Sequence, residues 1–89
     1  MKIYAFDGKA NVTGTRIHLA RKSLGLSQDA LAARMQLENI EISQKAISRI
    51  EKQERFVSDY ELRAFARVLH VTVEWLLDED SAAPGETSE

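Results

Sequence analysis

The apolar residues of this 89-residue chain recur at the spacing of helices rather than of strands. The clearest pattern follows Ser58, which can cap a helix that we expect to run to about His70. Apolar residues fall there at i, i+3, i+4 and i+7, as they do in one buried helical stripe: Leu62, Phe65, Ala66 and Leu69. The same period predicts four further helices and no strand.

Two of these helices lie in the first half of the chain. Asn11 is the expected N-cap of the first, which we place at roughly residues 12–24, with Gly25 as its end. Its buried stripe is expected to consist of Ile17, Ala20 and Leu24.

Ser27 offers an N-cap hydroxyl for a second, short helix of about nine residues. Its stripe is expected to consist of Leu31, Ala32 and Met35. Asn39 and the β-branched Ile40 and Ile42 break the pattern over residues 36–42, which therefore indicate a loop.

Ser43 is expected to cap a third helix over residues 44–52. Its apolar positions are Ala46, Ile47 and Ile50. Its other faces carry polar side chains, namely Gln44, Lys45, Ser48, Arg49 and Lys52. A last helical turn or two begins at Thr72. Trp75 is expected either at the end of the core, with Leu76 and Leu77, or on the outer side of this turn, where it could form part of a patch for a second subunit. The inward residues of this turn are expected to be Val73, Leu76 and Leu77.

Composition is consistent with one small domain, which we place at residues 11–78. We expect residues 1–10 to form an arm and the acidic residues 79–89 a disordered tail. The absence of cysteine excludes disulfides and thiolate metal sites. The longest apolar run, residues 30–33, is far shorter than the roughly 18 residues of a membrane span. These features predict a cytoplasmic protein.

The net charge of −2 is unevenly distributed. Residues 1–55 contain ten lysines and arginines against six acids, whereas residues 56–89 contain two against eight. Because charges are screened within about 8 to 10 Å in cellular salt, a basic surface in the first part can bind phosphates although the whole chain is acidic. A nucleic-acid partner is therefore compatible with the charge.

Two short consecutive helices joined by a turn are typical of a helix-turn-helix. In such a unit the second helix enters the DNA major groove, and side chains near its N-terminus reach the base edges. Gln44, Lys45 and Arg49 are of the types that pair with adenine or guanine. The same residue types also occur on any solvated helix face, and composition alone favours this simpler interpretation.

A series of motifs carries a family resemblance. In order they are Leu-Gly-Leu-Ser-Gln at 24–28, Leu-Ala at 31–32, Ile-Ser-Arg-Ile-Glu at 47–51 and Trp-Leu-Leu at 75–77. Over about residues 11–78 the chain resembles the helix-turn-helix family of phage repressors, Cro proteins and Xre-type regulators. The resemblance implies an all-α, five-helix bundle of the lambda-repressor type that binds double-stranded DNA as a homodimer, without a cofactor.

Residue roles follow from the same resemblance. It implies that bases are read by Gln44, Lys45 and Arg49. It implies phosphate contacts from Gln28, Ser48, Lys52 and Arg55, and we add Arg16 or Lys22 as further candidates. Arg21 and Glu51 resemble the family's structural pair, which orients the third helix against the first.

Three features depart from the family pattern. The turn at residues 36–42 is about three residues longer than the family's shortest form. Gln53 and Glu54 stand where the family commonly has glycine and lysine. The arm has no counterpart in the family's core, and three roles for it stay open: pairing with a partner chain, packing on the first helix or remaining loose.

Other kinds of site have little support. His18 and His70 are isolated, so that no metal site is expected. The four glycines form neither a dinucleotide fingerprint nor a P-loop, and no nucleophile stands in a catalytic motif. We therefore expect a DNA-binding regulator, not an enzyme. The alternatives are an antitoxin that grips a protein through its arm or tail, and an interaction module that has lost DNA binding.

Overall fold

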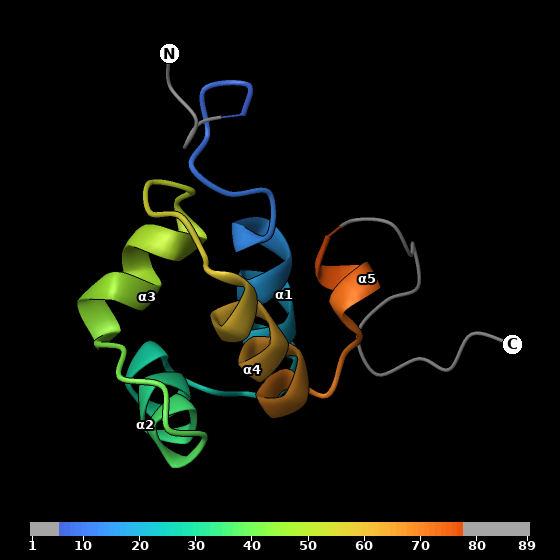
Figure 1. The fold of residues 1–89 in the computed structure, drawn as a ribbon. Coiled ribbons are helices and arrows are strands. Elements are labelled where there is room, and N and C mark those ends of the chain that lie inside the picture. The colour runs from blue at the N-terminus through green and yellow to red at the C-terminus, as the bar shows by residue number, and fades with distance from the viewer. Residues whose placement is uncertain (1–5, 78–89) are drawn as a thin grey trace, which may run out of the picture.

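The computed structural model describes residues 6–77, which form a bundle of helices (Figure 1). Five helices follow one another in this range: α1 (Gly14–Ser23), α2 (Gln28–Leu37), α3 (Gln44–Glu51), α4 (Asp59–Leu69) and α5 (Val73–Leu76). α1 packs against α3, α4 and α5, and α2 packs against α3 and α4, so that the helices enclose one core. The predicted all-α fold class is confirmed.

Large apolar side chains from all five helices fill the core. The fully buried ones are Ile17, Leu31, Met35, Ile47, Ile50, Phe65, Leu69 and Leu76. Each of these residues was assigned to a buried stripe from the sequence. Leu24 was also predicted to be buried, but this prediction is wrong, because 41% of Leu24 is exposed. Gly25, with φ of +70°, turns the chain at the end of α1, and the next residue, Leu26, packs against the core instead.

The start of α1 differs from the prediction. Its N-cap is Thr13 rather than Asn11, and the Thr13 side chain makes no capping hydrogen bond. The Asn11 side chain still receives the first amides of the helix, because its Oδ1 accepts from the backbone N–H groups of Thr13 at 3.1 Å and Gly14 at 2.7 Å. Asn11 therefore satisfies helix amides from two residues further back than a standard cap.

The end of α2 also differs, since the helix continues through Leu37 although residues 36 and 37 were assigned to the loop. Asn39 then adopts φ of +64°, and the backbone N–H groups of Asn39 and Ile40 donate to the carbonyls of Gln36 and Met35. Asparagine tolerates this left-handed conformation and closes α2 as glycine closes other helices. The lengthened turn returns Ile42 to the core, where it is buried.

α3 and α4 are also followed by residues with left-handed backbone conformation, but these residues are less suited to it than glycine or asparagine. Gln53 after α3 and His70 after α4 have φ of +64° and +60°. Both values lie in the region that favours glycine. At the start of α4, Ser58 and Glu61 form the reciprocal hydrogen bonds of a capping box, which confirms the predicted N-cap.

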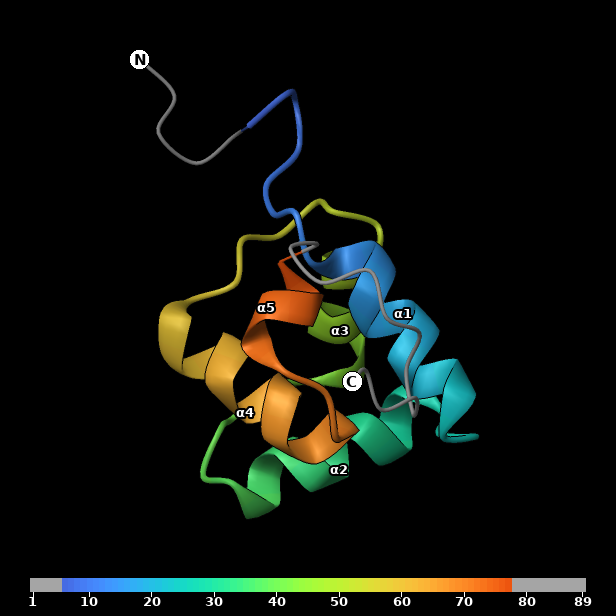
Figure 2. The same cartoon turned by 90° about the vertical axis from the view of Figure 1, so that its right-hand side faces the viewer.

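Trp75 in α5 is buried, with only 4% of its surface exposed. Of the two positions predicted for it, the one at the end of the core is confirmed and the outward one is wrong. The guanidinium group of Arg16 lies 4.4 Å from the centre of the Trp75 ring, and its Nη1 donates to the Trp75 carbonyl at 3.0 Å. α5 packs beside α1, as seen in Figure 2. A short helix can bury its largest residue because a long cation covers one ring face.

The described part of the arm forms a tight turn. Phe6 and Lys9 exchange two backbone hydrogen bonds around Asp7 and Gly8, both of which have positive φ. The backbone N–H of Ala10 then donates to the Gln53 carbonyl at 3.0 Å, which joins the arm to the loop after α3. Residues 1–5 and the predicted tail at 79–89 lie outside the described residues.

Candidate nucleic-acid interface

α3 is amphipathic, and its two faces have different tasks. Ile47 and Ile50 are fully buried and fix the helix in the core. The Ser43 hydroxyl accepts from the Ala46 amide at 3.0 Å and caps the helix start. The remaining side chains form a surface that we call the polar face of α3: Gln44, Lys45, Ser48, Arg49 and Lys52. All of them are exposed except Ser48, which is half-buried.

The start of this face is tied to α2. The Gln44 side chain donates from Nε2 to the Oε1 of Gln28 at 2.6 Å. Gln28, in the first turn of α2, in turn donates from its Nε2 to Glu51 Oε1 at 3.1 Å. Gln44, which is predicted to read a base, is therefore in direct contact with Gln28, which is predicted to bind phosphate. Gln28 links both to the carboxylate of Glu51 at the end of α3.

Glu51 is the centre of this network. Arg21 donates to both of its oxygens, from Nε to Oε2 at 2.6 Å and from Nη2 to Oε1 at 2.9 Å. Only 8% of the Arg21 side chain and 6% of the Glu51 side chain are exposed. Arg21 also donates to the Leu26 carbonyl at 2.8 Å, and His18 Nδ1 lies 2.9 Å from Glu51 Oε1. The ion pair implied by the family resemblance therefore joins α1 to α3 with two-point geometry.

The charge on Glu51 is strongly favoured. Burial alone raises the pKa of a carboxylate, but the hydrogen bonds from Arg21, His18 and Gln28 and the Arg21 charge together outweigh it and lower the pKa of Glu51. The hydrogen bond to Glu51 correspondingly raises the pKa of Arg21 against the opposing effect of burial. Both partners are therefore ionised at neutral pH.

A second junction between α1 and α3 was not found from the sequence. Asn11 donates from Nδ2 to the carbonyls of Ile50 at 3.1 Å and Arg55 at 2.7 Å. A methyl group on Gly14 would collide with the Ile50 carbonyl oxygen, so that α1 can approach the end of α3 only with glycine there. The asparagine and glycine were visible in the sequence, but their partners lie about forty residues away.

Arg55 was predicted to contact phosphate, and the structure gives it an ion-pair partner. Its Nη1 and Nη2 donate to the two oxygens of Glu61 at 3.2 and 3.1 Å. Burial raises the pKa of Glu61, but the hydrogen bonds from Arg55 and Ser58 and the Arg55 charge outweigh it, and the pKa is lowered. The phosphate contact of Arg55 stays a prediction.

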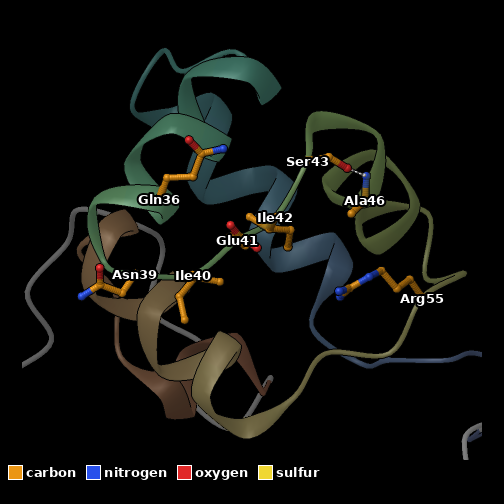
Figure 3. Close-up of a pocket in the computed structure, with 8 residues that line it drawn as sticks. All are labelled: Gln36, Asn39, Ile40, Glu41, Ile42, Ser43, Ala46 and Arg55. Carbon is orange, nitrogen blue, oxygen red and sulfur yellow. Dashed lines mark hydrogen bonds between the residues drawn. The ribbon is translucent and has the colours of Figure 1, made fainter.

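Figure 3 shows an open groove beside the lengthened turn. The residues that line it are Gln36, Asn39, Ile40, Glu41, Ile42, Ser43, Ala46 and Arg55. The Arg55 side chain points into this groove from the loop after α3 (Figure 3). Most of the lining residues belong to the turn between α2 and α3, and the position of the groove could not be predicted from the sequence.

The two further phosphate candidates differ in their surroundings. The Arg16 guanidinium is held against Trp75, as described above. Lys22 is exposed near the end of α1. Within residues 6–77 no group of three or more histidine, aspartate or glutamate side chains is arranged to hold a metal ion.

The sequence profile of the helix-turn-helix family matches residues 17–76. The chain belongs to this family. Its fold is also similar to that of the P22 c2 repressor protein, solved in complex with a synthetic operator, with a TM-score of 0.67 and 30% sequence identity over 78% of this chain and 97% of that one. No curated protein sequence matches this chain at a significant level.

The helix-turn-helix unit itself consists of α2, the turn after it and α3. This family comprises the phage repressors, Cro proteins and Xre-type regulators, so that the resemblance noted in the sequence is confirmed. None of the helices in the described part of the chain has the length and apolarity needed to cross a bilayer.

Proposed function

We propose that this helix-turn-helix protein is a sequence-specific repressor of transcription, which binds a palindromic operator as a homodimer. The observation that carries the proposal is the exposed polar face of α3, presented by a helix whose opposite side is locked into the core. The similar P22 c2 repressor was solved with a synthetic operator, which supports the same use here. Two copies would set their α3 helices in successive major grooves about 34 Å apart.

Specificity is assigned to the front of α3. Gln44 offers an amide that pairs with adenine, and Lys45 and Arg49 offer cations that pair with guanine O6 and N7. The network through Gln28 and Glu51 orients this front, because the Gln44 amide is already held at 2.6 Å from Gln28. Base contacts from a preorganised helix face lose less conformational entropy on binding than contacts from free side chains.

Affinity is assigned to phosphate contacts that surround this front. The residues proposed for them are Gln28, Ser48, Lys52 and Arg55, with Arg16 or Lys22 as additional candidates. Such contacts fix the position of the protein on the duplex without reading its sequence. The regulatory step is occlusion of the promoter by the bound dimer, which requires no chemistry.

A second candidate function is a protein-interaction role, as in an antitoxin or a module that has lost DNA binding. Glu54 favours it, because this exposed acid stands at the end of α3, close to the proposed phosphate contacts. Titration with salt separates the two functions. A protein that neutralises several phosphates must lose affinity steeply with increasing salt, whereas an interaction module shows no DNA binding to lose.

Selection of bound sequences from random DNA duplexes tests the main proposal directly. We expect an enriched half-site repeated with inverted symmetry, since a twofold dimer reads both strands in the same way. Recovery of no sequence above background would contradict DNA reading and favour the interaction module.

Two substitutions then distinguish residues that contact bases from residues that contact phosphates. Arg49→Ala should cost about 1 to 3 kcal/mol on the selected operator and relax the preference at one base pair. Gln28→Ala should weaken binding to operator and random DNA, and any change in preference should be confined to the base pair that Gln44 contacts. Gln36→Ala is the matched control for Gln28→Ala. Gln36 is an exposed glutamine on the same helix, but it lines the groove of Figure 3 and has no proposed DNA contact. Equal losses on operator and random DNA for Arg49→Ala would refute its assignment to a base.

A further inference from the structure

A hollow of about 360 Å³ lies between the start of α1, the start of α2 and the end of α3. The side chains that line it are Thr15, His18, Gln28, Ser48, Glu51 and Lys52. We propose that this hollow holds one phosphate of the DNA backbone, and that His18 must become protonated to hold it, so that DNA binding takes up a proton. The inference rests on the DNA binding proposed above and adds a site and a pH dependence to it.

The hollow combines side chains whose roles were assigned separately or not at all. Gln28, Ser48 and Lys52 are proposed phosphate contacts, and all three line this one space. Thr15 and His18 line the same space from α1, and no role in DNA binding was predicted for either of them. A hydroxyl, an amide and an ammonium group around one space are the donors that a phosphate, which only accepts hydrogen bonds, requires.

Charge in the hollow favours an anion despite the carboxylate at its base. Arg21 donates to both oxygens of Glu51, so that the buried pair has no net charge. Lys52 from α3 adds one positive charge, and α2 contributes only the neutral Gln28. Protonation of His18 adds a second positive charge on the side of α1.

The hydrogen bond between His18 and Glu51 shows why the second proton is needed. His18 Nδ1 lies 2.9 Å from Glu51 Oε1, and because a carboxylate oxygen can only accept, we assign the proton of the neutral ring to Nδ1. Arg21 Nη2 lies 3.2 Å from Nδ1 because it donates to the same oxygen, also at 2.9 Å. The neutral ring then has a bare Nε2, which repels a phosphate oxygen.

A phosphate can therefore accept from His18 only when Nε2 carries a proton as well, in the imidazolium form. The proton is taken from water on binding, and no covalent bond is formed or broken.

The test measures DNA affinity by fluorescence anisotropy at constant salt between about pH 6 and pH 8. We expect the affinity of the wild-type protein to fall about tenfold over this range, as one charge-assisted contact is lost. His18→Asn keeps a donor for Glu51 but has no Nε2, and should bind weakly at every pH. His18→Lys has a fixed charge and should remove the pH dependence while it restores affinity at pH 8.

His70→Asn is the matched control. It removes the chain's other histidine from the end of α4, where asparagine tolerates the left-handed backbone. This variant should keep the full pH dependence of the wild-type protein.

A second arm of the test changes the DNA and leaves the protein intact. Replacing single phosphates by uncharged methylphosphonates should remove the pH dependence at one position of each half-site and at no other. A wild-type affinity that is independent of pH, or a pH dependence that survives in His18→Asn, would overturn the inference while leaving DNA binding in place. Absence of DNA binding at every pH would instead overturn the proposed function and this inference with it.

Discussion

The side chains of Glu51 and Glu61 are only 6% and 8% exposed, and each accepts hydrogen bonds from an arginine on both oxygens, but the two arginines differ in their surroundings. Only 8% of the Arg21 side chain is exposed, against 29% for Arg55. Arg21 stands thirty residues before its partner on a different helix, whereas Arg55 stands six residues before its own. The first pair is therefore a long-range contact and the second a local one.

The difference shows how one chemical unit stabilises two levels of structure. Glu61 also accepts from the Ser58 amide at 3.0 Å, so that its carboxylate completes a helix start already encoded in neighbouring residues. Glu51 holds α1, α2 and α3 together through His18, Arg21 and Gln28. Loss of Glu61 weakens a helix end, whereas loss of Glu51 changes the position of the polar face of α3.

The largest effect is expected for Glu51→Ala. Removing one partner strands the other charge in the interior, which costs about 3 to 5 kcal/mol of unfolding free energy. Urea unfolding followed by circular dichroism measures the loss. Glu38→Ala is the control, because its partner Arg67 is 58% exposed and such surface pairs contribute under about 1 kcal/mol. Similar losses for the two variants would contradict a special role for the Arg21–Glu51 pair.

A smaller loss, of about 2 kcal/mol, is expected for Glu61→Ala. The variant loses the return hydrogen bond of the capping box, but Arg55 is exposed enough to remain hydrated after its partner is removed. DNA affinity at a pH where the variant is folded should not fall, because Arg55 is then free to contact phosphate. A drop in affinity as large as that of Glu51→Ala would show that both pairs position α3.

Acid should act on both pairs, with a smaller effect than either substitution, because a protonated carboxyl still accepts some hydrogen bonds. The pKa of each glutamate is lower in the folded protein, so that the stabilisation is complete above the ordinary pKa of about 4.3 and is lost as pH falls through the lowered values. Urea midpoints measured from pH 7 down to about pH 3 test this. Glu51→Gln should reduce the fall of the urea midpoint at acid pH. An unchanged fall would show that the loss of stability in acid comes from other groups.

The smallest change in unfolding free energy is expected from glycine substitutions at the two residues with left-handed backbone that follow α3 and α4, Gln53 and His70. His70→Gly should raise the unfolding free energy by about 1 kcal/mol, because His70 is exposed and glycine adopts its φ of +60° without strain. Gln53→Gly should gain less, since the Gln53 side chain donates to the Asn11 carbonyl at 3.2 Å. Thermal unfolding at one pH orders the two variants, and a larger gain for Gln53→Gly would contradict the value assigned to that hydrogen bond.

Much of the fold could be predicted because its signals are local. The stripe through Phe65 and Leu69 and the serines that cap α2, α3 and α4 lie within one or two turns of the residues they affect. The predictions were wrong where a contact between residues far apart in the sequence determines the local structure. Asn11 lies two residues before the N-cap of α1, and its side-chain Nδ2 donates to the carbonyls of Ile50 and Arg55, which are about forty residues away.

The site was predicted in part for the same reason. Residues on the polar face of α3 share that face by helical period alone, and the Arg21–Glu51 pair came from a family resemblance. The role of His18 could not be predicted, since its Nδ1 meets a carboxylate thirty-three residues away. The sequence left the position of Trp75 open between the core and the outer side, because a short helix has too few residues to define a buried stripe.

The sequence by itself determined which segments become helices and which side of each is apolar, because both depend on interactions between residues three or four positions apart. Only the tertiary structure decided how α1 meets α3, and hence that His18, Gln28 and Lys52 surround one hollow at the base of which Glu51 is neutralised by Arg21. That arrangement depends on desolvation and on hydrogen bonds between distant residues, which exist only once the core has formed.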